Sequence, residues 1–100
     1  MDRFQVVVDP ALAPIMDRYM ELRRVELGQL EAALESGDGK AVMGLGHKLK
    51  GTGSSYGLDR LTELGAAIEE AGSDRKLDVA RGLIRAVRDF IEHVDIVYGE

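Results

Sequence analysis

Gly46-His47-Lys48-Leu49-Lys50-Gly51-Thr52-Gly53-Ser54-Ser55-Tyr56-Gly57 is the stretch from which the rest of the chain can be interpreted. It holds one of the two histidines of the chain and four of its twelve glycines. The preceding residues, from Lys40 onward, are typical of the first turns of a helix, which places His47 in the middle of that helix. At about 100° per residue, Leu45 and Leu49 point away from His47. We therefore predict that His47 faces water.

The helical neighbours of His47 leave open space around its ring. Gly44 and Gly51 lie one turn before and after it, although each glycine costs about 1 kcal/mol relative to alanine inside a helix. Lys50 adds a cation three residues after the histidine. An exposed histidine with open space on both sides of its ring and one adjacent ammonium group fits a nucleophile that receives a phosphoryl group and passes it on. The buried side of this helix should consist of Val42, Leu45, Leu49 and Thr52.

The composition limits the class of protein. A chain of 100 residues with 45% hydrophobic and 31% charged residues indicates a single domain, 1–100, with one core and a polar surface. The absence of cysteine excludes a disulfide framework and thiolate chemistry. No apolar run approaches the ~18 residues of a membrane span, and no signal-peptide pattern is present. The net charge of −5 argues against a nucleic-acid partner. We expect a cytoplasmic monomer with neither a membrane nor a nucleic acid as partner.

Hydrophobic periodicity predicts an all-α fold. Four amphipathic segments are joined by short loops, which is typical of an antiparallel up-down four-helix bundle. A short helical turn over about 10–13 should precede the first helix, because Asp9-Pro10 is a good helix start. The predicted helices cover about 14–35, 39–54, 58–71 and 74–97, the last with Val97 and Tyr98 facing inward.

The N-terminal segment Phe4–Val8 is rich in β-branched residues but too short to form a sheet alone. No other segment has the pattern of a partner strand. We therefore expect residues 1–9 to form an extended arm that lies on the bundle.

The first predicted helix has a wider apolar stripe than one core face requires. One interpretation is that this helix contacts two neighbouring helices. The other is that some of its apolar residues stay exposed as a docking patch, namely some of Ile15, Met16, Tyr19 and Met20.

The stretch from His47 to Gly57 resembles the motif of histidine-containing phosphotransfer (HPt) domains from bacterial and fungal phosphorelays. In that family a helix bears His-x-Leu-Lys-Gly, followed by small residues, a glycine and a third amphipathic helix. Here the motif is His47-Lys48-Leu49-Lys50-Gly51, and Gly57 matches the glycine before the third helix. The resemblance implies a four-helix bundle that covers nearly the whole chain. Gly44, Gly53 and the Phe4–Val8 arm depart from the general pattern.

The resemblance also implies roles for individual residues. His47 would be the phospho-acceptor, Lys50 would help to neutralise the phosphoryl group, and Gly51 would be the small residue beside the ring. Glu69 lies where family members often carry Glu or Gln near the site. No carboxylate lies within reach in the helix turn of His47, and none is needed, because an exposed imidazole is mostly neutral at neutral pH.

The partner implied by the resemblance is the receiver domain of a response regulator, a hybrid histidine kinase, or both. The receiver would supply a phosphorylated aspartate and Mg²⁺, so we expect no cofactor and no metal site in this chain. The sequence contains no Walker-type or kinase-type glycine loop, so it should not phosphorylate itself. The predicted docking surface comprises Met43, Gly44, Lys48, Lys50, Gly51 and Ser54, with Met16 and Tyr19 of the first helix.

Two alternatives belong to other classes. A non-catalytic helical adaptor would bind a partner through the apolar patch of the first helix, and His47 would be incidental to it. A metal-dependent bundle enzyme would need several inward Glu and His residues. Asp89, Glu92 and His93 are not expected to face inward together.

Overall fold

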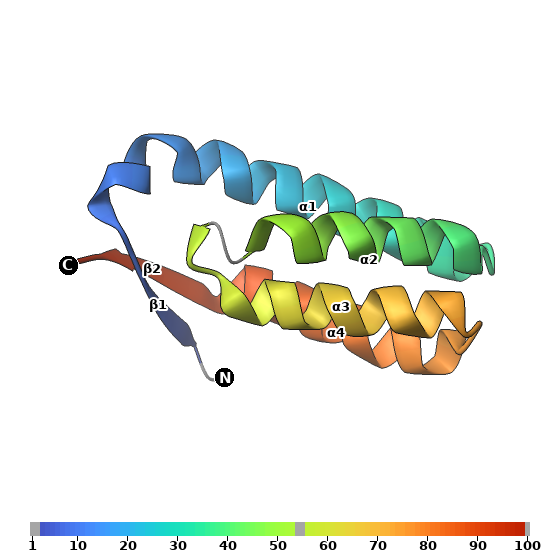
Figure 1. The fold of residues 1–100 in the computed structure, drawn as a ribbon. Coiled ribbons are helices and arrows are strands. Elements are labelled where there is room, and N and C mark those ends of the chain that lie inside the picture. The colour runs from blue at the N-terminus through green and yellow to red at the C-terminus, as the bar shows by residue number, and fades with distance from the viewer. Residues whose placement is uncertain (1–2, 54–55, 100) are drawn as a thin grey trace.

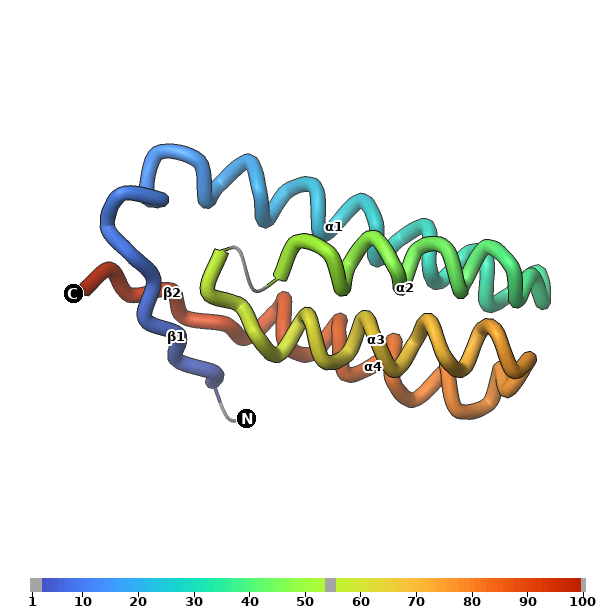
Figure 2. The backbone as a smooth tube through the Cα atoms, in the orientation of Figure 1, coloured from blue at the N-terminus to red at the C-terminus, as the bar shows by residue number. Residues whose placement is uncertain are grey.

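Helices dominate the residues that the computed structural model describes, which are 3–53 and 56–99. In these ranges the chain forms four α helices that alternate in direction, as Figure 1 shows. The tube in Figure 2 follows the four passes, with their connections at alternating ends. The predicted all-α, up-down four-helix bundle is confirmed. The helices are α1 (Ala13–Glu35), α2 (Gly39–Gly53), α3 (Asp59–Ser73) and α4 (Leu77–His93).

Local side-chain caps set the first two helix starts. The Asp9 carboxylate accepts a hydrogen bond from the Ala11 backbone N–H at 2.9 Å and begins the short 3₁₀ helix η1 (Pro10–Leu12), which leads into α1. The Asp38 carboxylate accepts a hydrogen bond from the Ala41 N–H at 3.0 Å, at the start of α2. Both caps satisfy backbone donors that have no partner inside the helix. Gly37 reverses the chain between α1 and α2 with a φ of 71°.

The core is formed by the inward faces of all four helices and by Val8 and Leu58, which lie outside them. Val42 and Leu49 of α2 are buried as predicted, whereas Leu45 and Thr52 are only half-buried. Two glycines, Gly46 and Gly53, occupy part of the buried side of α2 that was predicted for Leu45 and Thr52. The largest fully buried side chains are those of Val8, Met16, Leu30, Val42, Leu49, Leu58, Leu61, Ile68 and Val87.

The predicted N-terminal arm is a β strand. Strand β1 (Phe4–Val8) pairs in parallel with strand β2 (Val94–Tyr98), in a register that places Phe4 beside Val94. The two strands lie together at one end of the bundle (Figure 1). Arg3 and Asp95 form a bidentate ion pair across them, with both N···O distances at 2.7 Å. The prediction of an unpaired arm was therefore wrong.

The same strand pair corrects the predicted end of the fourth helix. Helix α4 ends at His93, not at Val97, and the backbone of Val94 is already extended (φ −74°, ψ 133°). The segment Val94–Tyr98 consists of β-branched and aromatic residues except at Asp95, and such residues favour strands. Val97 and Tyr98, predicted to face inward, are 40% and 42% exposed.

The turn between α3 and α4 also lies later than predicted. Gly72 does not end α3 but is buried inside it, and the helix continues to Ser73. The reversal occurs at Arg75, whose φ of 58° is unusual for a residue other than glycine. Helix α4 consequently begins at Leu77 instead of Asp74.

Candidate functional site

The His47 side chain lies on the outer face of α2 and is 66% exposed. This is the position that the helix period predicts. Gly44 and Gly51 are exposed on the same helix, and a Cβ added to either would meet nothing within 4 Å. The space around the ring is therefore open, and another molecule can approach the imidazole closely.

Glu69 of α3 contacts both candidate side chains of α2, His47 and Lys50. Its Oε2 lies 2.8 Å from Nδ1 of His47, and its Oε1 accepts a hydrogen bond from Nζ of Lys50, also at 2.8 Å. The helix turn of His47 contributes no carboxylate, as expected, but the neighbouring helix does. One carboxylate thus uses one oxygen for each of two partners, and it stands between α2 and α3.

The charge state of Glu69 follows from these contacts. The hydrogen bond from Lys50 lowers the pKa of the Glu69 carboxyl group, partial burial raises it, and the contact with His47 lowers it again. The net effect is a pKa below the ordinary value of 4.5. Glu69 is therefore ionised at neutral pH and can only accept hydrogen bonds.

This charge state assigns the proton on the histidine ring. Because Glu69 can only accept, Nδ1 of His47 must be the donor in their contact. In a neutral imidazole the lone pair then lies on Nε2. The site consequently combines an exposed nucleophilic nitrogen, an anion behind the ring and an ammonium group beside it.

Two residues of the predicted docking surface are buried. Met16 is 1% and Tyr19 4% exposed, so the prediction that they stay exposed on α1 was wrong for both. The ring of Tyr19 stacks on that of Tyr56 with centroids 4.1 Å apart, and the guanidinium group of Arg23 lies 4.6 Å from the Tyr19 centroid. Both residues face the neighbouring elements, which supports the first interpretation of the wide apolar stripe.

The other predicted surface residues belong to α2. Lys48 is exposed, Met43 and Lys50 are half-buried, and Ser54 lies outside the residues that the structure describes. Gly53, which departs from the general pattern of the motif, is buried against Thr62 of α3.

A groove beside α2 exposes two apolar residues of α1. Ile15 is 45% and Leu22 39% exposed, and both line this groove of about 390 Å³. Its lining residues are Pro14, Ile15, Arg18, Tyr19, Leu22, Arg23, Thr52 and Tyr56. The sequence named Ile15 as a candidate for exposure, but it did not distinguish Ile15 from its buried neighbours. Both exposed residues lie seven positions apart, which places them on one side of the helix.

At this groove, Arg23 forms a buried ion pair within α1 and a hydrogen bond to the end of α2. Nε of Arg23 lies 2.8 Å from Oε1 of Glu26, and Nη1 of Arg23 donates a hydrogen bond of 2.6 Å to the Thr52 hydroxyl. The two partners of Arg23, Glu26 of α1 and Thr52 of α2, were not predicted from the sequence.

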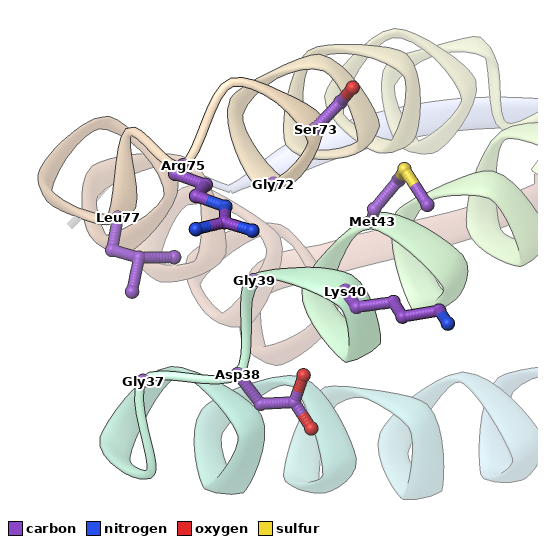
Figure 3. A pocket seen from close by; sticks show the side chains of 9 residues that line it. All are labelled: Gly37, Asp38, Gly39, Lys40, Met43, Gly72, Ser73, Arg75 and Leu77. Atoms are coloured by element: carbon purple, nitrogen blue, oxygen red, sulfur yellow. The ribbon is translucent and has the colours of Figure 1, made fainter.

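A second hollow, of about 510 Å³, lies at the opposite end of the bundle from the strands. Figure 3 shows Gly39 close to Gly72 at its base, with Lys40 and Arg75 on its rim. It contains neither His47 nor Glu69. In the described parts of the chain, no three His, Cys, Asp or Glu residues are grouped so that they could hold a metal ion. Of the helices within residues 3–53 and 56–99, none has the length and apolar character needed to span a membrane.

Comparison with known proteins gives one match. The family model described as the Hpt domain matches residues 15–96. This range contains all four helices except the first two residues of α1, and it includes His47, Lys50 and Glu69. No curated protein and no solved structure matches the chain.

Proposed function

Because the chain belongs to the Hpt domain family, whose members carry phosphoryl groups in two-component phosphorelay signalling, we propose that His47 is its phospho-acceptor. In this proposal His47 exchanges the phosphoryl group with the aspartate of a receiver domain. The observation that carries the proposal is the Glu69 carboxylate, which contacts both Nδ1 of His47 and Nζ of Lys50.

The acceptor step uses the lone pair on Nε2 of His47. Nε2 attacks the phosphorus of the aspartyl phosphate, the N–P bond forms, and the bond from phosphorus to the aspartate oxygen breaks. The aspartate leaves as a carboxylate, so no proton has to be transferred. The ring keeps its Nδ1 proton and acquires positive charge, which the Glu69 carboxylate stabilises at 2.8 Å. Catalysis is then mainly positioning and charge neutralisation.

Lys50 balances charge on the product side. The phosphoryl group brings nearly two negative charges, and the ammonium group of Lys50 lies on the same face of α2. Glu69 already neutralises part of that cation. The mid-helix position also leaves the phosphoryl group no free backbone N–H. The phosphohistidine is therefore stabilised only modestly, which suits a carrier that must release what it accepts.

The receiver domain would dock on the outer face of α2 and on the adjoining groove of α1. Lys48 and Gly51 supply the part of this surface nearest to His47, and the exposed side chains of Ile15 and Leu22 supply its apolar part. Exposed apolar groups that line a groove are typical of a docking surface. The Mg²⁺ implied by the resemblance would belong to the receiver.

The proposal is tested by phosphoryl transfer from phosphorylated receiver domains of the same organism. Wild type should take up a label that is labile in acid and stable in alkali. His47→Gln should take up none, and His93→Gln, which removes the other histidine, should be labelled like wild type. ATP alone should label none of the three proteins.

Two other outcomes would contradict the proposal. Equal labelling of wild type and His47→Gln would move the acceptor to another residue. No labelling by any receiver in a full panel would favour the adaptor, and pull-downs with variants of Ile15 and Leu22 would then be the next experiment.

A further inference from the structure

Glycines bring the backbones of α2 and α3 into direct contact. A Cβ added to Gly46 would lie 2.6 Å from the backbone nitrogen of Glu69, and one added to Gly65 would meet the backbone nitrogen of Lys50. These neighbours are backbone atoms, which cannot rotate away as a side chain can. Any side chain at either position must therefore push the two helices apart.

These two contacts involve the residues of the site themselves. Gly46 directly precedes His47 and touches the backbone of Glu69, while Gly65 touches the backbone of Lys50. The two helices are thus in close backbone contact where the carboxylate has to reach across. The other close glycine contacts lie about one turn away, between Gly72 and Met43, and about two turns away, between Gly53 and Thr62.

The two hydrogen bonds of Glu69 allow little change in the distance between α2 and α3. Its two oxygens lie 2.8 Å from His47 and from Lys50, and hydrogen bonds weaken rapidly once the donor–acceptor distance exceeds about 3.2 Å. Moving α3 outward by about 1 Å would break at least one of these contacts. A carboxylate bound at both oxygens cannot compensate by rotating toward one partner without leaving the other.

We propose that Gly46 and Gly65 are positioning residues for phosphotransfer. They set the α2–α3 spacing at which one carboxylate can hold the Nδ1–H form of His47 and bind Lys50. The expected effect on phosphoryl transfer rests on the proposed function, since only a reactive His47 requires its proton to be on Nδ1. The geometric part of the claim stands on the contacts alone.

The experiment compares Gly46→Ala and Gly65→Ala with wild type. The first readout is the ¹⁵N NMR spectrum of the His47 ring at about pH 8, where a free imidazole is neutral. Wild type should show the proton on Nδ1, and both variants should lose this preference. The second readout is the rate of phosphoryl transfer from a labelled receiver, which should fall by roughly tenfold or more.

Two alanine variants are matched controls. Gly53→Ala also forces α2 and α3 apart, because its Cβ would lie 2.7 Å from the backbone nitrogen of Thr62, but this contact lies about two helix turns from His47 and Glu69. Gly82→Ala on α4 adds a Cβ where nothing lies within 4 Å. Both should keep the wild-type ring spectrum and transfer within about twofold of the wild-type rate.

Retention of the Nδ1–H form in Gly46→Ala and Gly65→Ala would overturn the inference, and so would its loss in Gly53→Ala. If the first two variants do not fold, Glu69→Asp shortens the reach by one methylene without touching the helix contact. It should lose the ring preference, and an unchanged spectrum would overturn the claim that the spacing is critical. The ring spectrum needs no phosphoryl donor, so failure of the proposed function would appear separately, as absence of label on wild type.

Discussion

Glu69 links the two helices that build the site, and its ionisation reports on that link. The carboxyl group contacts the ammonium group of Lys50 and the ring of His47. Since its pKa is lower in the folded protein than the ordinary value of 4.5, the contact stabilises the fold above that pH. This contribution is lost as the pH falls through the folded-state pKa.

Lys50→Met should raise the pKa of Glu69 toward its ordinary value, because the hydrogen bond from Lys50 is the largest cause of the lowering. An NMR titration that follows the side-chain carboxyl carbon of Glu69 measures this directly. Lys48→Met removes an exposed lysine of the same helix and should leave the midpoint unchanged. The same midpoint in wild type and Lys50→Met would contradict this interpretation of the bridge.

Arg23→Ala should lower the free energy of unfolding by about 3 kcal/mol, because it leaves the Glu26 carboxylate buried without its partner. Urea denaturation provides the value. The control is Arg18→Ala, whose partner Glu21 is 62% exposed, and it should change the stability by less than about 0.5 kcal/mol. A similar, small decrease in the free energy of unfolding for both variants would show that burial does not increase the contribution of the Arg23–Glu26 pair to stability.

At this scale the sequence is informative within one helix and much less so between helices. The period of 3.6 residues is sufficient to place His47 and Lys50 on the outer face of α2. The position of Glu69, 22 residues after His47, depends on how α3 packs against α2. Only the family resemblance placed it near the site. The glycines at seven-residue intervals, Gly46 with Gly53 and Gly65 with Gly72, were a signal for this close packing that we did not use.

Short polar residues cap the starts of η1 and α2, whereas the other helix starts have no side-chain cap and the end of α4 depends on contacts further away. Asp38 is the clearest example of a cap, since it receives the Ala41 N–H at the start of α2. By contrast, the apolar pattern of α4 continues without interruption into Val94–Tyr98. That pattern suits a helix and a strand equally well until β1 is known to lie beside it.

Asp38→Ala should destabilise the protein by about 1 kcal/mol through loss of the cap on α2. Asp38→Asn should restore most of the loss, because an asparagine side chain can accept the same hydrogen bond. Thermal unfolding of the three proteins gives the comparison. Equal stability of Asp38→Ala and wild type would show that the carboxylate does not act as a cap.

The parallel strand pair joins the two ends of the chain across one end of the bundle. Val8 is 1% exposed and belongs to the core, whereas its neighbour Val7 is 59% exposed. The ribbon is therefore attached to the bundle by one face. This feature could not be predicted from local patterns, because its two strands are separated by the whole bundle.

Val8→Ala should reduce the free energy of unfolding by about 2 kcal/mol, and Val7→Ala by less than about 0.5 kcal/mol. Both substitutions lower β propensity equally, so their difference isolates burial against the helices. Chemical denaturation of both variants supplies this difference. Equal effects would indicate that the strand pair does not pack on the core in solution.

The central claim for the whole molecule is that the bundle presents Nε2 of His47 as the acceptor of a phosphoryl group. The most direct measurement is ³¹P–¹⁵N correlation NMR on ¹⁵N-labelled protein after transfer from a phosphorylated receiver domain. We predict phosphorus coupled to Nε2 of His47, with the proton retained on Nδ1. Coupling to Nδ1, or phosphorus attached to any other residue, would contradict the account.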